Sequence, residues 1–512
     1  MNFLTKGLFI VLVLHGSNAG LFSKSKATEV TKDVNLKEES AISTESNSEA
    51  IDVMDNLALT KDGLLDFDGL IKKFKLTSIV SLIQKSITAD GKLNVKTLIE
   101  NFKLDELNFS SICSAISRQA TKFVEKVTNN YDVIDYLTST FVQDSEDGKL
   151  DFTGLATKYI GAIEEYDVIT EDGYILKLFH IPGDESNPVL IAHGFFSSSD
   201  DFLLQGKTSL IYSLSENNHD VWVMNFRGNL HSRRHVELDP DTDKKFWEYS
   251  IHECGYYDLP AVIDFILAKT NQEKLSVIGH SAGSAYTFVL ASTRPEYNDK
   301  IKVFVALAPV VYFSNPGVAF STIIRFEPVI NELLVSYGAE ELFGEKKIER
   351  KIYRLLCSQG KLSYKYCWQL GFGALFGHNP DNVEPELFTS SLGHFPAGAS
   401  RMNFIHYLQI GNSGKFGQYD FGRENLERYG SKEPPAYDLQ RATFDVSMIV
   451  GANDKVLGLE EAERIRSEVP NVVGYQIVED EAFSHVDFLY GKNADELVYS
   501  HVIAILNKYS QV

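Results

Sequence analysis

Cysteine, long apolar runs and basic charge are all scarce in this chain of 512 residues. Four cysteines are few, and neither a C-x-x-C pair nor a cluster of histidines indicates a metal site or a cofactor. Acidic residues outnumber Lys and Arg by 70 to 49, and the net charge of -21 argues against binding to nucleic acid, whose phosphates attract positive charge. Because a membrane-spanning helix needs about 20 apolar residues, we expect no transmembrane segment.

The N-terminus has the pattern of an export signal. Lys6 precedes an apolar stretch at residues 8–14 that is too short to cross a bilayer, and the small residues up to Ala19 are typical of a cleavage site. We therefore expect residues 1–19 to be a signal peptide and the mature protein to be secreted or to enter the lysosomal lumen. Residues 20–56 are rich in Ser and Glu with few large apolar side chains, which predicts a disordered segment. Asn108 is the predicted glycosylation site.

Residues 57–162 contain a degenerate repeat. Asp62, Asp90 and Asp147 each begin an Asp-Gly turn before an apolar pattern, with a period of roughly 28 residues and one copy eroded. These turns resemble an EF-hand loop, but calcium requires a bidentate acid at the end of the loop. The corresponding positions hold Gly69, Thr97 and Gly154. We expect a small helical domain without bound calcium, and inhibition, targeting and docking all remain open as its role.

The motif GHSAG at residues 279–283 fits G-x-S-x-G and follows an apolar strand at residues 275–278. A serine on a sharp turn between a strand and a helix needs neighbours without Cβ atoms, so that its hydroxyl projects from the sheet. Ser281 is therefore the candidate nucleophile. The alternative interpretation of the motif is an ordinary tight turn.

A carboxylate and an imidazole follow Ser281 in the order that an α/β-hydrolase requires. The apolar run 446–450 leads to Asp454, and the run 475–478 leads to His485. The chain order Ser, Asp, His is that of the α/β-hydrolase triad. His485 would take the serine proton and Asp454 would orient the imidazole. Taken singly, each residue also fits an ordinary turn or surface position, and Asp487 is the rival carboxylate.

An oxyanion hole is predicted at the end of an earlier strand. The buried run 188–192 leads into His193-Gly194-Phe195, where the glycine allows the backbone amides to turn toward the edge of the sheet. In this fold one donor is the amide after the nucleophile, here Ala282, and the other comes from the early loop, here Phe195.

Several blocks from residue 165 onward occur in a fixed order: EYDVITEDGYILKLFHIP, HGFFSSSDDF, VWVMNFRGNLHSRRH, GHSAGS, HFPAGASRMNFIHYLQIGNSGKFGQYDFG, VGANDKVLG and FSHVDFLYG. With these blocks the chain resembles the acid lipase family of gastric and lysosomal lipases. The resemblance implies an α/β-hydrolase core with a cap over the active site, and hydrolysis of neutral lipid esters such as triacylglycerols or cholesteryl esters. It also implies the triad roles of Ser281, Asp454 and His485, with oxyanion amides from Phe195 and Ala282.

Two residues depart from the family pattern. The family usually has glutamine where this chain has Ala282, and often leucine where it has Phe195. Since the oxyanion uses backbone N–H groups, catalysis should survive both changes. The larger apolar wall beside the acyl site makes shorter or altered acyl chains the expected consequence.

The cap is expected at residues 312–394, the longest insertion between Ser281 and Asp454. The resemblance implies a disulfide between Cys357 and Cys367, which export to an oxidising compartment would permit. The remaining cysteines, Cys113 and Cys254, are expected to be buried thiols. The resemblance further implies an apolar lid that opens at a lipid surface, and the alternative is a set of ordinary helices covering the core.

The predicted architecture is an α/β-hydrolase domain at residues 163–512 with a helical cap, preceded by the small helical N-terminal domain. The predicted function is a serine ester hydrolase acting at a lipid–water interface, with no cofactor and with unknown protein partners. A carboxylesterase or acyltransferase acting on other esters is the first alternative. A lipid-binding carrier on a hydrolase scaffold is the second. A chain beginning near residue 165 would contain every residue named for the chemistry, and we expect it to keep its activity on a soluble short-chain ester. An insoluble core would instead show that the repeat-bearing region packs as an integral part of one domain.

Overall fold

The computed structural model describes residues 138, 142 and 144–510, apart from 314–315, 359–363 and 380. The predicted signal peptide, the acidic segment, Asn108, Cys113 and the first two repeat copies lie outside the described residues.

Within the described residues, eight strands form one sheet in the order β1-β2-β4-β3-β5-β6-β9-β10. The first two strands pair antiparallel, as do β2 and β4, and all later neighbours are parallel. The strands are β1 (Glu164–Ile169), β2 (Ile175–Ile181), β3 (Asp184–Ala192), β4 (His219–Met224), β5 (Leu275–His280), β6 (Ile301–Leu307), β9 (Asp445–Val450) and β10 (Val472–Ile477). This mostly parallel sheet confirms the predicted α/β-hydrolase class.

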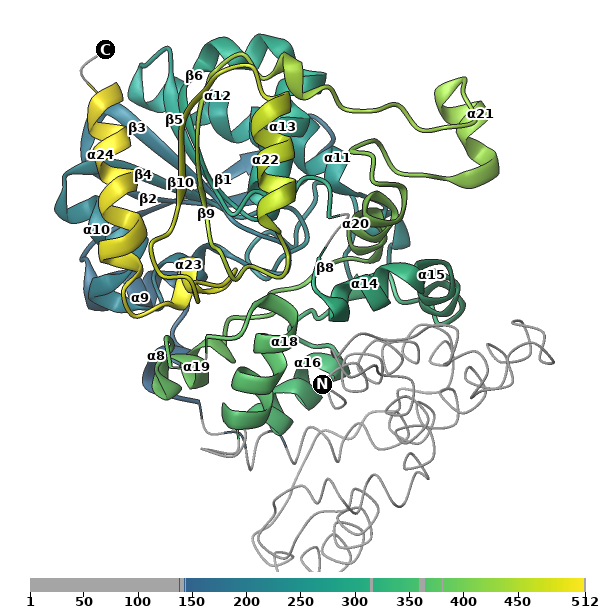
Figure 1. Cartoon of the computed structure of the whole chain (residues 1–512), viewed down its shortest axis with the longest axis horizontal. Helices are drawn as coiled ribbons and strands as arrows, with labels where there is room; N and C mark the ends of the chain where they lie inside the picture. Colours follow the sequence, from purple (N-terminus) through teal and green to yellow (C-terminus); the bar gives the residue numbers. More distant parts are fainter. Residues whose placement is uncertain are drawn as a thin grey trace, which may run out of the picture.

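The central strands β5 and β6 are mostly apolar and buried along almost their whole length because helices cover both faces of the sheet. On one face lie α12 (Leu259–Thr270), α13 (Ala282–Thr293) and α22 (Leu459–Glu468), and on the other lie α9 (Phe152–Tyr159), α10 (Leu210–Glu216) and α24 (Ser500–Tyr509) (Figure 1). At one edge Ala192 pairs with Gly279, and Leu307 pairs with both His280 and Ile449. The parallel strands therefore end together, and the loops that follow them meet there.

The chain between β6 and β9 leaves the sheet and forms helices on one side of it (Figure 1). The elements of the cap, residues 312–394, are α14 (Val318–Arg325), α15 (Glu327–Ser336), β7 (Glu341–Leu342), α16 (Ile348–Cys357), a π-helical segment (Tyr364–Phe372), α18 (Gly373–Phe376) and α19 (Pro385–Ser391). They are followed by β8 (Ala399–Ser400), which pairs antiparallel with β7, then by α20 (Arg401–Ser413) and α21 (Asn425–Tyr429). The shorter helices elsewhere are α8 (Glu146–Lys149), α11 (Ile251–Glu253) and α23 (Asp487–Tyr490). No helix in the described part of the chain is both long and apolar enough to traverse a bilayer.

The third repeat copy folds as α8 and α9 and packs against the rest of the molecule. Phe152 is fully buried, and its ring stacks on Phe179 of β2 with the ring centroids 4.2 Å apart. The Asp147 carboxylate accepts from the Tyr159 hydroxyl at 2.5 Å. Arg354 of α16 donates to both carboxylate oxygens of Asp144 at 2.6 Å. Residues 144–162, which the sequence assigned to the N-terminal region, thus contact both the sheet and the cap.

Candidate active site

Ser281 lies on a strained turn between β5 and α13. Its φ of 54° and ψ of -117° are unfavourable for a residue with a Cβ atom. Its amide donates to the carbonyl of Leu307 at 2.9 Å, which holds the turn against β6. A Cβ at Gly283 would lie 2.3 Å from the carbonyl oxygen of Ala192, so only glycine allows α13 to approach β3 this closely. This geometry is that of a nucleophile elbow.

Three side chains from three strand-end loops meet at this turn. The Nε2 atom of His485 lies 2.8 Å from the Oγ atom of Ser281, and its Nδ1 atom lies 2.7 Å from Oδ2 of Asp454. All three residues are at most 9% exposed. If Nδ1–H donates to the carboxylate, Nε2 is free to accept the serine proton.

The Asp454 carboxylate is itself held in place by its own loop. Its Oδ1 atom accepts from the amides of Val456 and Leu457 at 2.7 and 2.8 Å. One oxygen thus binds the loop and the other faces the imidazole. A carboxylate held in this way can fix the tautomer of a neighbouring imidazole and stabilise an imidazolium.

The rival carboxylate, Asp487, has different partners. Its Oδ2 atom accepts from the Ser484 amide at 2.6 Å and from the Asn379 side chain at 3.0 Å. Burial raises the pKa of the Asp487 carboxyl to about 6. His485 therefore pairs with Asp454 and not with Asp487.

The amides of Phe195 and Ala282 lie beside Ser281. A Cβ at Gly194 would be 3.1 Å from the Cβ of Ser281, which shows how closely the early loop approaches the elbow. Within the described residues neither amide donates to another protein group. Two free N–H groups beside a serine can bind a negatively charged oxygen.

His193 holds the early loop and was not singled out by its sequence pattern. Burial lowers its pKa to about 4, so the ring is neutral. Its Nδ1–H donates to the Gly194 carbonyl at 2.8 Å, and its Nε2 accepts from the Phe226 amide at 3.0 Å. A neutral imidazole with one donor and one acceptor satisfies both groups.

Aromatic side chains surround the site. Phe195 stacks on Phe404 of α20 with the ring centroids 6.1 Å apart. From the cap, the Phe376 ring lies nearly parallel to the His485 ring at 6.0 Å, and Phe320 meets Phe376 at 5.9 Å. The sequence indicated only that the cap is rich in aromatic residues, because which ring reaches His485 depends on how the cap folds back.

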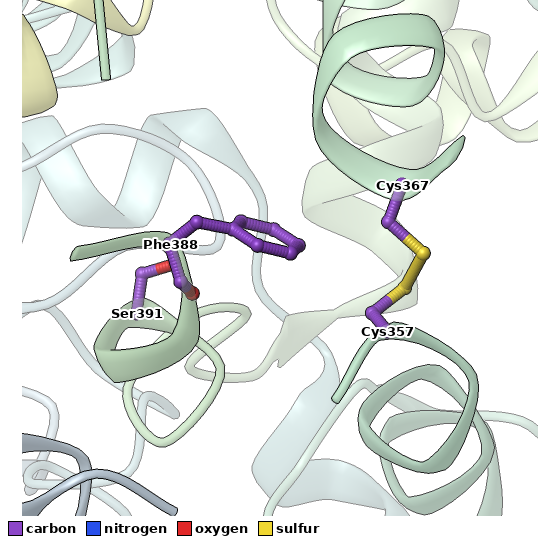
Figure 2. The surroundings of a disulfide bond; sticks show 4 residues. All are labelled: Cys357, Cys367, Phe388 and Ser391. Carbon is purple, nitrogen blue, oxygen red and sulfur yellow. A yellow bond between two sulfur atoms is a disulfide. The ribbon is translucent and has the colours of Figure 1, made fainter. Parts of the chain in front are cut away.

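A disulfide joins Cys357 at the end of α16 to Cys367 of the π-helical segment, with Cα atoms 5.7 Å apart. Figure 2 shows the Phe388 ring of α19 directed toward this bridge. Cys254 is a buried thiol, and burial raises its pKa well above the ordinary value. Apolar burial makes such a thiol unreactive.

The fold and this cluster define the chain as an α/β-hydrolase with a Ser–His–Asp constellation at the strand ends. Family models agree: one for the alpha/beta hydrolase fold matches residues 187–328, and one for a partial alpha/beta-hydrolase lipase region matches residues 154–206. The chain is 35% identical to Lipase 1 of Drosophila melanogaster, with 71% of this chain and 81% of that protein covered. It is 33% identical to gastric triacylglycerol lipase of Rattus norvegicus, with 67% and 88% covered, and 32% identical to Lipase member K of Homo sapiens, with 68% and 88% covered. The chain belongs to the acid lipase family and is a lipase-type carboxylic ester hydrolase.

Proposed function

We propose that the enzyme hydrolyses neutral lipid esters, such as triacylglycerols or cholesteryl esters, through an acyl-enzyme formed on Ser281. The observation that carries this proposal is the position of His485 between Ser281 and Asp454, with contacts of 2.8 and 2.7 Å. A buried imidazole in this position can move a proton between a serine and a substrate oxygen.

In the proposed reaction, His485 takes the proton of Ser281 while Oγ attacks the ester carbonyl carbon. The carbonyl oxygen becomes an oxyanion that accepts hydrogen bonds from the amides of Phe195 and Ala282. The tetrahedral intermediate collapses when the imidazolium gives its proton to the departing alkoxide. Water then attacks the acyl-enzyme with His485 again as the base, which releases the fatty acid and restores the serine.

The apolar surroundings favour a lipid acyl chain. Phe195, Phe404 and the cap residues Phe320 and Phe376 present rings and no charge toward this side of the site. The name of the rat relative, gastric triacylglycerol lipase, supports the same substrate class. Phe195 is larger than the leucine that the family often has at this position, so we propose a preference for shorter or altered acyl chains within this class.

We further propose that the protein is exported, with residues 1–19 as the signal peptide and Asn108 as a glycosylation site. The Cys357–Cys367 bridge supports this proposal because disulfides persist in oxidising compartments. A secreted product and a lysosomal product both fit these features. Purification of the protein from medium or from lysosomes would distinguish the two. Its intact mass would show whether residues 1–19 are removed and whether Asn108 is glycosylated.

The test is hydrolysis of emulsified long-chain triacylglycerol, emulsified cholesteryl ester and a soluble short-chain ester, each from acidic to neutral pH. The full chain should cleave at least one emulsified ester, and a fluorophosphonate probe should label Ser281 alone. Binding of lipid without turnover would favour the carrier alternative. Turnover of the soluble ester only would favour a carboxylesterase.

A further inference from the structure

One stretch of the cap, residues 376–382, contacts both loops that carry the partners of Ser281. The carbonyl oxygen of Phe376 accepts from the His485 amide at 3.1 Å and from the Lys455 amide at 3.3 Å. Lys455 directly follows Asp454 in the chain. A single carbonyl group in the cap therefore accepts hydrogen bonds from both the loop that carries Asp454 and the loop that carries His485.

The next two residues of this stretch are in equally close contact with these loops. Gly377 has a φ of +119°, and a Cβ there would lie 2.2 Å from the Asn453 carbonyl oxygen and 2.8 Å from the Cβ of Ser484. The Asn453 side chain donates to the carbonyls of His378 at 3.0 Å and Ala482 at 3.2 Å. The backbone at residues 376–378 thus lies between, and contacts, the loops that carry Asp454 and His485.

Asp487 connects this stretch of the cap to the loop that carries His485. Its side chain is buried, with the whole residue only 1% exposed, and its Oδ2 atom accepts from the Ser484 amide and from Asn379. Ser484 directly precedes His485, and Asn379 belongs to the cap stretch. At the far end of the stretch, the Lys492 amide donates to the Asn382 carbonyl at 2.8 Å. Both ends of residues 376–382 are therefore fastened to the core.

We infer that Asp487 is a positioning residue for His485, which it holds in reach of Ser281 by fastening Ser484 and the cap stretch 376–382 to each other. This role rests on the proposed function of His485 as the base. It also implies that Phe376, Asn379 and Asn382 keep their contacts with the core during turnover.

The test compares Asp487→Ala and Asp487→Asn in the full chain, with a soluble short-chain ester as the substrate. The hydrogen bonds from Ser484 and Asn379 both end on Oδ2, so an Asn carbonyl oxygen in that place can accept both, whereas Ala accepts neither. We expect Asp487→Ala to lower kcat by about 10–100-fold with KM changed less than about twofold, since small displacements of a reacting group cost about this much. Asp487→Asn should keep kcat within about threefold of the wild type.

Asn379→Ala removes the cap partner of the same hydrogen bond and should also lower kcat. Because the two residues share one interaction, their effects in the double variant should be less than additive. If Asp487→Ala does not fold, the kcat of Asn379→Ala decides by itself. Glu384→Ala is the matched control, because it removes a cap–core ion pair to Lys492 that lies on the exposed surface at 2.9 Å.

Three results would overturn the inference: kcat unchanged in Asp487→Ala, equal losses in the Asn and Ala variants, or an Asn379→Ala enzyme with wild-type kcat. Labelling by a fluorophosphonate separates this failure from failure of the proposed function. If wild-type Ser281 is not labelled, the proposed function fails. If it is labelled but these variants behave as the wild type, only the role of Asp487 fails.

Discussion

The strand-end loops around Ser281 and the cap above them are held by different interactions. The loops follow neighbouring parallel strands, and backbone hydrogen bonds continue the sheet into them, as from Ala308 to Ile449 and from Val478 to Val450, both at 2.9 Å. The cap, besides the backbone hydrogen bonds made by Phe376 and Asn382, is held by side chains that reach distant segments. Examples are the contacts of Arg233 with Glu341 at 2.9 Å and of Asp200 with His394 at 2.7 Å.

The strand-end loops therefore hold the reacting groups, and the cap controls how substrate reaches them. A sheet edge is a rigid place for reacting groups, because moving one loop breaks pairing along a whole strand. Side-chain contacts between a cap and a core can change one at a time, which permits opening. Substitutions in the strand-end loops should therefore abolish turnover with little loss of stability. Substitutions in most of the cap should lower stability with little loss of turnover.

The largest effect is expected for Ser281→Ala, at the centre of the loops. Turnover of a soluble ester should fall by about four to six orders of magnitude, the range for losing a triad nucleophile. The thermal unfolding midpoint should not fall, since the substitution removes only a hydroxyl from a strained turn. A variant with more than about a tenth of wild-type activity would show that Ser281 is not the nucleophile.

The next prediction compares the two carboxylates beside His485. Asp454→Asn should lower kcat by about 10⁴-fold because the wrong imidazole tautomer is then stabilised. Asp487→Asn should lower it at most about threefold, because its partners donate from neutral N–H groups that an amide oxygen can accept. Steady-state kinetics of the two variants ranks them directly, and equal losses would reverse our assignment of the acid.

A third prediction concerns α9, which packs on the sheet outside both regions. Phe152, Leu155 and Ala156 are fully buried against the sheet. Phe152→Ala should lower the free energy of unfolding by about 3–5 kcal/mol, as for other buried aromatic residues. A chain beginning at residue 165 should be insoluble although it holds every residue named for the chemistry, whereas one beginning at residue 138 should fold. Denaturant titration measures the first effect, and a soluble, active short chain would contradict the second.

Within the cap, replacing Cys357 and Cys367 by serine should cost about 2–5 kcal/mol if the bond is structural. The bridge joins α16 to the π-helical segment within the cap and involves none of the residues named for the chemistry (Figure 2). Activity on emulsified lipid should therefore fall more than activity on a soluble ester, since only the former needs a well-shaped apolar rim. Parallel losses on both substrates would mean that the bridge supports the whole fold and not the rim.

The smallest effect, and the one that depends on pH, is expected at His394, the last residue of the cap. Its Nδ1 faces Asp200 at 2.7 Å and its Nε2 faces the Asp147 carbonyl at 2.9 Å, so only the imidazolium can donate to both. Burial alone would lower the pKa of His394, but the hydrogen bond and the charge of Asp200, the Asp147 carbonyl and the charge of Asp201 together raise it. His231 shares the same carboxylate at 2.7 Å.

Because the folded-state pKa is raised, this contact stabilises the protein fully below the ordinary imidazole pKa of about 6.5 and is lost as pH rises through the higher value. The difference in unfolding midpoint between the wild type and His394→Gln should thus be larger at about pH 5 than at about pH 8. The exposed His501→Gln serves as the control. An equal difference at both pH values would show that His394 is neutral in the folded protein.

Most of the hydrolase fold could be predicted from the sequence because its parallel strands contain short apolar runs and its elbow needs glycine at specific positions. The run at β5 and the motif that follows it illustrate both points. The contacts of α9 could not be predicted, because an Asp-Gly turn before an amphipathic helix does not reveal which surface the helix covers. The third repeat copy therefore was assigned to a separate N-terminal region, although Phe152 stacks on a strand of the sheet.

The sequence by itself determined the class of fold, the family and the candidate residues Ser281, Asp454 and His485, since these depend on short motifs and on their order along the chain. Only the tertiary structure decided which carboxylate faces His485 and which cap residues touch the strand-end loops. The sequence favoured Asp454 because it follows an apolar run, but a position in the chain does not show which carboxylate oxygen faces the imidazole. The distinction arises where β9 ends beside β10 and the Phe376 carbonyl comes between the two loops, because hydrogen bonds depend on distances that exist only after the chain has folded.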